Sequence, residues 1–226
     1  DRAQATDEFT KATAALTEKR LAAAKKLARA VNKLLPSLGM EGGKFAATHA
    51  PRTTPHAHGA EDITFEVKLN EGMDSKPLAR VASGGELSRL MLALKVVLAS
   101  HDVVPTLVFD EVDQGIGGEI GSRVGKALVD VSRSGRQALV ITHLPQIAVH
   151  ADQQLVVAKG KKGGVATSDV MVVNGDDRVK EIARMLGDAD MATARRHAVE
   201  VLKTASVTCP TGSETPTPPA PSRPRR

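Results

Sequence analysis

The strongest constraint on the fold is a pair of short apolar runs that a helix-length segment separates. The first run, from Thr106 to Phe109 in "PTLVFDEV", is continuously apolar, and the second is "QALVIT" from Gln137. Runs of this kind are typical of strands in a parallel sheet, which helices cover on both faces. Between them, apolar residues recur at helical spacing over residues 119–132. The order strand–helix–strand therefore predicts an α/β fold with a largely parallel sheet.

The stretch "VASGGELSRLMLALKVVLA", residues 81–99, predicts an apolar helix that opens with two glycines. Ser83 and Glu86 fit a capping box, in which the serine caps the helix and the glutamate reaches back to it. The capping box leaves Gly84 and Gly85 unexplained, since a glycine inside a helix costs roughly 1 kcal/mol relative to alanine. Beside a helix N-terminus, however, glycines leave N–H groups open to an anion such as phosphate. The stretch is therefore either an ordinary capped core helix or a seat for a phosphate.

Composition narrows the class of protein. The 226 residues, 41% of them hydrophobic, are enough for one α/β domain with extensions or for two small domains. Because Trp and Tyr are absent and Phe occurs four times, we expect an aliphatic core and no stacking platform for single-stranded nucleic acid. The single cysteine, Cys209, cannot form an internal disulfide, and no secretory signal or membrane-length apolar run is present. We therefore expect a cytoplasmic protein.

The ends of the chain carry most of its net charge of +5. Residues 1–44 have a net charge of +4 and residues 207–226 of +2, while residues 45–206 carry −1. A nucleic-acid surface would therefore lie on the end segments, although a basic helix is more often a solvated face. We expect a coiled-coil end helix with its connector over 1–44, an α/β lobe over 45–206 and a disordered Pro/Arg-rich tail over 207–226. Since the first residue is Asp1 and not Met, we expect the chain to be part of a longer protein.

The other segments give weaker patterns. A sparse apolar stripe predicts one long helix over residues 3–35, which Pro36 and Gly39 end. A loop that contains Pro51 follows, and it carries three histidines: His49, His56 and His58. Because no fourth ligand or cysteine is near, we expect a solvated loop and not a metal site. Further elements are expected over residues 63–70 (strand), 153–159 and 165–173 (strands, the second as a hairpin), 177–186 and 191–205 (helices).

Polar side chains follow both apolar runs at the point where each strand ends. Asp110 and Glu111 follow the first run, and His143 ends the second. Since functional groups in open α/β sheets gather at the carboxyl ends of strands, we expect these side chains at one edge of the sheet. An aliphatic strand that ends in Asp-Glu fits a Walker B motif, in which the first carboxylate holds Mg²⁺ and the second activates water. The ordinary alternative is a polar strand end that caps the next element.

Three stretches together resemble the signature, Walker B with D-loop, and switch-histidine motifs of ABC-type ATPase heads: "VASGGELSRLMLALK", "LVFDEVDQGIGG" and "VITHLPQIAVHAD". Within that group they are most similar to the RecN family of bacterial SMC-like DNA-repair ATPases, as is the later "DRVKEIARMLG". The resemblance covers residues 60–203 and, more loosely, the helix before them. It implies the C-terminal lobe of an ABC/SMC-type P-loop NTPase head with a largely parallel sheet, preceded by a long coiled-coil-end helix.

The resemblance also implies roles for individual residues, with ATP and Mg²⁺ as cofactors. Asp110 would serve Mg²⁺, Glu111 would be the general base, and His143 would read the γ-phosphate. The residues implied to bind the nucleotide are Ser83, Gly84, Gly85, Glu86, Gln114, Gly115 and Gly117. The first three would contact the γ-phosphate of a nucleotide held by a second head, and the last three belong to the D-loop that crosses to that head. Arg89 is either a surface residue or a link between nucleotide and DNA.

No phosphate-binding loop of the form G-x-x-x-x-G-K-[ST] occurs in the chain. The Gly-Lys pairs at Gly43, Gly125 and Gly160 each lack the upstream glycine and the Ser/Thr after the lysine. In SMC-like proteins that half of the head comes from the N-terminal end, beyond a coiled coil. The resemblance therefore implies an ATP hydrolase only when the N-terminal P-loop half of the same protein completes the head, and we expect the isolated chain to be inactive.

The leading interpretation is the C-terminal lobe of a RecN-like ATPase that binds and hydrolyses ATP at a head–head interface in DNA double-strand break repair and recombination. It implies a homodimer through ATP-engaged heads, DNA as a partner of the complete protein and no membrane partner. It also implies a nucleoid-associated place in the bacterial cytoplasm. Two alternatives stay open: another SMC- or RecF-like repair ATPase lobe with the same motifs, and a non-catalytic interaction module.

Overall fold

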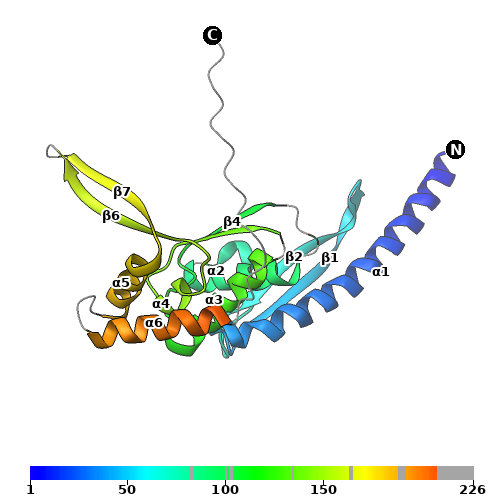
Figure 1. Ribbon diagram of the computed structural model, residues 1–226. Helices are drawn as coiled ribbons and strands as arrows, with labels where there is room; N and C mark the ends of the chain where they lie inside the picture. Colours follow the sequence, from blue (N-terminus) through cyan, green and yellow to red (C-terminus); the bar gives the residue numbers. More distant parts are fainter. Residues whose placement is uncertain are drawn as a thin grey trace, which may run out of the picture. The chain divides into compact units, whose positions relative to one another are not determined.

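The computed structural model describes residues 1–81, 84–99, 101, 104–133, 135–162, 165–187 and 192–207 (Figure 1). The chain divides into two compact units, Asp1–Val172 and Val173–Arg226. The elements up to the end of β7 are α1 (Arg2–Leu34), the 3₁₀ turn η1 (Leu35–Leu38), β1 (Lys44–His56), β2 (Gly59–Lys68), β3 (Lys76–Pro77), the 3₁₀ turn η2 (Leu78–Arg80), α2 (Gly84–Val97), β4 (Thr106–Phe109), α3 (Gly118–Arg133), β5 (Gln137–Val140), α4 (Pro145–Ala148), β6 (Gln154–Lys162) and β7 (Val165–Val173). The second unit contains α5 (Gly175–Leu186) and α6 (Ala192–Val207), which pack against each other.

The predicted long helix is confirmed as α1. The Asp1 side chain accepts a hydrogen bond from the N–H of Ala3 and caps the helix. At the other end Pro36 lies in the first turn of η1, and Gly39 takes a φ of +76°, a left-handed conformation that suits glycine. The first turns of α1 are exposed, whereas Val31 near its end is fully buried. The last turns of the helix therefore belong to the core.

Residues 44–56 form a strand, β1, so the prediction of a solvated loop in this segment is wrong. β1 pairs with β2 in an antiparallel hairpin as far as Pro51 and Glu61, where the register shifts. In the sheet order β1-β2-β3 the strand lies at an edge. A proline is tolerated there, because an edge strand does not need every N–H for pairing and a register shift removes further pairs. The predicted strand over 63–70 is confirmed as part of β2.

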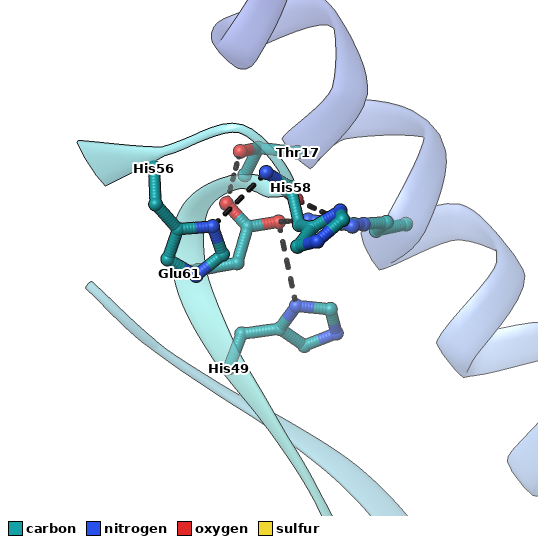
Figure 2. A network of polar contacts seen from close by, with 6 residues as sticks. Thr17, His49, His56, His58 and Glu61 are labelled. Carbon is teal, nitrogen blue, oxygen red and sulfur yellow. Dashed lines mark hydrogen bonds and ion pairs between the residues drawn. The ribbon is translucent and has the colours of Figure 1, made fainter. Parts of the chain in front are cut away.

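A buried carboxylate fastens the hairpin to α1 (Figure 2). Glu61 is 8% exposed, accepts a hydrogen bond from the Thr17 hydroxyl and lies 3.5 Å from Nη1 of Arg20. Its Oε1 also lies 4.0 Å from Nδ1 of His49, and Arg20 donates a second hydrogen bond, of 2.8 Å, to the carbonyl of His58. Of the three histidines, His58 therefore helps to attach the hairpin to the helix through its carbonyl, whereas His49 lies beside Glu61 within the hairpin. Within the described residues no group of three His, Cys, Asp or Glu side chains is arranged to hold a metal ion.

The two apolar runs form the parallel pair β4–β5, in register from Thr106 and Gln137 onward. The predicted class, an α/β fold with parallel strands after a long helix, is confirmed. In the described part of the chain parallel pairing is limited to these two strands, and one face of the pair is open. Val108 is 64% exposed and its register partner Leu139 is 43% exposed, whereas Leu107 on the other face is buried. The expected burial on both faces therefore does not occur among the residues that the structure describes.

The core joins the end of α1 with the elements from β1 to α4. Its buried members come from α1 and η1 (Val31, Leu35, Leu38), the hairpin (Phe45, Val67), α2 (Leu90, Leu92, Ala93, Leu94), β4 (Leu107, Phe109), α3 (Val124, Leu128, Val131) and α4 (Ile147), with Met40 and Val112 between elements. The predicted aliphatic core is confirmed, with two phenylalanines among these members. No helix in the described ranges has both the length and the apolar character that a membrane span requires.

Candidate functional site

The predicted acidic pair follows β4 directly, in a tight turn. Asp110 is exposed, and its Oδ1 accepts a hydrogen bond of 2.9 Å from the N–H of Glu111. Glu111 is also exposed and has a φ of +57°, the one positive φ among the non-glycine residues that the structure describes. A left-handed backbone is unfavourable for a residue with a Cβ and is typical of functional turns. Both carboxylates therefore stay at the carboxyl edge of the parallel pair, as predicted.

The glycine-rich start of α2 lies against this turn. The N–H of Gly85 donates a hydrogen bond of 3.1 Å to Oε1 of Gln114. A Cβ on Gly84 would collide with Oε2 of Glu111, and one on Gly85 would collide with the side chain of Gln114. Close approach to Cβ and the backbone of Gln114 therefore requires Gly85, which a capping box alone does not explain, whereas at Gly84 the end of the flexible Glu111 side chain could move aside. Ser83 lies outside the described residues, so its predicted cap is not described either.

Two further bonds tie α2 to the same turn. The Ser88 hydroxyl donates a hydrogen bond of 2.7 Å to the carbonyl of Asp110, and Nη1 of Arg89 donates one of 2.7 Å to the carbonyl of Gln114. Arg89 is only 5% exposed, so its interpretation as a surface residue is wrong. Burial lowers the pKa of the Arg89 guanidinium from its ordinary value, and the nearby Glu86 carboxylate partly opposes this shift. Arg89 therefore fixes the backbone of the turn after Glu111.

Asp113 is a buried carboxylate that was not predicted from the sequence. It is 4% exposed, and its Oδ2 accepts hydrogen bonds of 2.6 Å from the Thr142 hydroxyl and 2.9 Å from the N–H of His143. The same oxygen lies 3.0 Å from Nδ1 of His143, whose side chain is 74% exposed. The signal for this residue was a second aspartate in "DEVD", one position after Val112, which is fully buried. Asp113 connects the end of β4 with the segment after β5.

Glycines on α3 let the segment after His143 pack closely. A Cβ on Gly125 would press on the ring of His150 and on the carbonyl of Gln146, and one on Gly121 would touch Gln146 and Leu144. The two glycines are one helical turn apart, so they face α4 together. Burial, together with the positive charge of Lys126, lowers the pKa of His150 and favours its neutral form. The close packing of α3 on α4 holds the residues that follow His143.

The structure thus links the three predicted motifs by direct contacts. The start of α2 bonds to Gln114, and Asp113, one residue earlier, bonds to the switch segment. Gly115 and Gly117 have open space around their Cα atoms, and Glu86 is half-buried in the first turn of α2. The donor set fits ATP and Mg²⁺. An exposed carboxylate such as Asp110 is a hard oxygen ligand, and the positive end of the α2 dipole favours a phosphate, although the N–H of Gly85 is bonded to Gln114 in this structure.

The structure thus contains a glycine-opened helix, a strand that ends in Asp-Glu and a parallel neighbour followed by Thr-His, the features on which the resemblance to ABC/SMC-type ATPase heads rests. No family model matches the chain. Curated proteins do match it. The DNA repair protein RecN of Streptomyces coelicolor is 44% identical over 204 residues, which is 84% of this chain and 36% of that protein. RecN of Treponema pallidum is 43% identical over 196 residues (84% and 34%), and RecN of Mycobacterium leprae is 39% identical over 219 residues (88% and 37%).

The chain is therefore a relative of RecN, and it spans about a third of the length of the RecN proteins that it matches. Among solved structures, an SMC ATPase from a study of ATP-driven dimerization and DNA-stimulated activation matches 76% of the chain at 20% identity, with a TM-score of 0.45. The Smc head domain with a coiled coil and joint from Pyrococcus yayanosii matches 83% of the chain at 21% identity, with a TM-score of 0.47.

Proposed function

We propose that this chain is the C-terminal lobe of a RecN-like ATPase, which binds and hydrolyses ATP where two heads meet and acts in DNA double-strand break repair and recombination. The observation that supports the proposal is the chain of contacts from α2 through Gln114 and Asp113 to His143. Those contacts bring the signature, D-loop and switch-histidine segments into one connected surface. Such a role puts the protein with the nucleoid in the bacterial cytoplasm.

The chemistry of this surface assigns a task to each group. Mg²⁺ and ATP would supply the phosphoryl group and its charge neutralisation. Asp110 offers the carboxylate ligand, and Glu111 takes the proton of the attacking water. Gly84 and Gly85 would face the γ-phosphate of a nucleotide on the opposite head, with the D-loop, Gln114 to Gly117, beside them; the Gly85 N–H, which donates to Gln114 here, would have to exchange that partner for the phosphate. His143 contributes a ring nitrogen to the same phosphate.

The proposal requires a P-loop half from the N-terminal part of the same protein. The open face of β4–β5 supports this requirement, since Val108, Leu139 and Ile141 are 64%, 43% and 59% exposed. A parallel pair with one bare apolar face is unusual, because parallel sheets are normally covered on both faces. Burying three such side chains would contribute roughly 1.5–3 kcal/mol each. The N-terminal half is the partner that would cover this face, because it would also supply the phosphate-binding loop that this sequence does not contain.

Assembly with that half is the experiment that tests the proposed function. When the chain is co-expressed with a P-loop-bearing N-terminal half from the same genome, we expect a stable complex that binds Mg-ATP. The double variant Val108→Asp with Ile141→Asp should reduce the recovered complex at least about 10-fold, because it places charges on the buried face. Met73→Asp, at an exposed apolar residue between β2 and β3, is the matched control and should leave recovery unchanged. Equal recovery of all three proteins would contradict the proposal, as would a complex without affinity for Mg-ATP.

We also propose that DNA contacts the complete protein through α1. Four cations lie on the solvent face of its second half: Lys25, Lys26, Arg29 and Lys33. They line an open depression with Ala22 and Ala30, and α1 has no acidic residue after Glu18. Within the described residues none of the four has an ion-pair partner, whereas Lys11 in the first half pairs with Asp7 at 2.6 Å. Like charges at i,i+3 and i,i+4 each destabilise a helix by roughly 0.2–0.5 kcal/mol. A polyanion such as DNA would neutralise these four cations, here called the α1 stripe, and offset that cost.

A further inference from the structure

Asp113 contacts both the backbone and the ring of His143. Its Oδ2 receives the Thr142 hydroxyl at 2.6 Å and the His143 N–H at 2.9 Å, which fix the backbone of the histidine. The same atom lies 3.0 Å from Nδ1 of the ring, which fixes the side chain. Thr142 in turn accepts a hydrogen bond of 3.0 Å from the N–H of Leu144. The buried carboxylate of Asp113 therefore holds the exposed imidazole of His143 in place.

This contact decides which ring nitrogen carries the proton. A carboxylate is an acceptor only, so Nδ1 of His143 must be the protonated nitrogen. A histidine side chain in water favours the other tautomer, with the proton on Nε2. The 3.0 Å contact with Asp113 therefore favours the less common tautomer, in which Nε2 is free of the proton, for a ring whose side chain is 74% exposed.

We propose that Asp113 is a positioning residue that holds His143 with Nε2 directed at the γ-phosphate site. The inference rests on the proposed function, because it assigns Asp113 a task in the same reaction. It adds that the turn carrying Glu111 and the switch histidine move together, since Asp113 is two residues after Glu111. An Asp113 that served only to attach the two loops would act on stability and leave the ring tautomer unchanged.

Nitrogen-15 NMR of the imidazoles in the full chain tests this directly and does not depend on ATP. At pH 8, above the range in which imidazoles ordinarily titrate, we expect the His143 resonances to report the Nδ1–H tautomer. The His143→Gln variant assigns those resonances among the seven histidines. Asp113→Ala should return the ring to the Nε2–H tautomer, because it removes the acceptor at Nδ1, whereas Asp130→Ala, at an exposed position on α3, should not. An Nε2–H ring in the unmodified chain, or an unchanged ring in Asp113→Ala, would overturn the inference.

Activity of the completed head separates positioning from attachment. Asp113→Ala should lower ATP turnover roughly 10–100-fold, as loss of a carboxylate that orients a functional histidine does at metal sites. Thr142→Val removes a hydrogen bond from the same carboxylate but leaves the Nδ1 contact, so it should lower thermal stability while the tautomer is kept. Turnover within 2-fold of the unmodified protein in Asp113→Ala would contradict the link to the reaction. If the tautomer shifts as expected but the unmodified head hydrolyses no ATP, the proposed function fails and the assignment of the ring contact stands.

Discussion

In a head completed by its P-loop half, Glu111→Gln lowers ATP turnover roughly 100- to 10,000-fold, the contribution that a positioned general base ordinarily makes. Glutamine has the size of glutamate but cannot take a proton from water. Glu111 is exposed at the edge of β4 and is held in a left-handed turn, next to the start of α2. Because only the proton transfer is removed, binding of Mg-ATP and pairing of heads should persist. The measurement is steady-state phosphate release, together with ATP binding by filter retention.

Glu119→Gln is the matched control for this prediction. Glu119 is an exposed glutamate on α3 that pairs with Arg123, and the mutation removes the same charge eight residues away in the sequence. Turnover of this variant should stay within 2-fold of the unmodified head. If Glu111→Gln behaves like Glu119→Gln, Glu111 is not the base. If Glu111→Gln also abolishes ATP binding, the change acts on the site as a whole and the assignment of a proton-transfer role is wrong.

We expect the variant with Lys25, Lys26, Arg29 and Lys33 of the α1 stripe all changed to Ala to bind duplex DNA more weakly. Its affinity should also depend less on the salt concentration. Each phosphate contact contributes about 0.9 to the slope of log K against log salt, so four contacts contribute between three and four units. Between 50 and 200 mM salt, the four contacts together account for roughly a 100-fold loss of affinity, which the variant should no longer show. The stripe carries no aromatic side chain for base stacking, which favours a duplex over a single strand. Fluorescence anisotropy with a labelled 30-base-pair duplex measures both quantities.

The control removes four positive charges elsewhere: Lys11, Arg52, Lys180 and Arg184, each changed to Ala. Each of these cations is paired with a carboxylate in the structure. The control variant should therefore keep most of the slope of log K against log salt, although its net charge equals that of the stripe variant. Identical slopes for the two variants would mean that net charge alone governs binding. Tight binding to a single strand of the same length, with weak binding to the duplex, would contradict the duplex assignment.

Much of the fold follows from periodicity in the sequence. The helices α1, α2 and α3 and the strands β4 and β5 lie where their apolar spacing predicts them, because each buries one regular face or run. β1 was missed since Pro51 interrupts it, and a proline in a strand is tolerated only at an edge or a bulge, which sequence spacing does not report. The bare face of Val108 and Leu139 was also missed. An apolar strand indicates burial, but it does not say whether the covering element belongs to the same chain.

The candidate site was predicted in its parts and not in its connections. Asp110, Glu111 and His143 were expected at strand ends, and they lie there. The carboxylate that holds His143 was not foreseen, because Asp113 and Thr142 are 29 positions apart and only the packing of β4 beside β5 brings them together. The burial of Arg89 depends in the same way on a tertiary contact, with the carbonyl of Gln114.

The measurement that tests the central claim most directly is ATP turnover of this chain alone, of a P-loop-bearing N-terminal half alone, and of the two mixed. A composite phosphoryl-transfer site loses orders of magnitude in rate when one part is absent. We predict turnover only in the mixture, and none when the mixture contains Glu111→Gln. Robust hydrolysis by the isolated chain would contradict the account, because it would mean that the phosphates are held without the missing loop. A folded complex that hydrolyses no ATP would contradict it too, and would favour a non-catalytic interaction module.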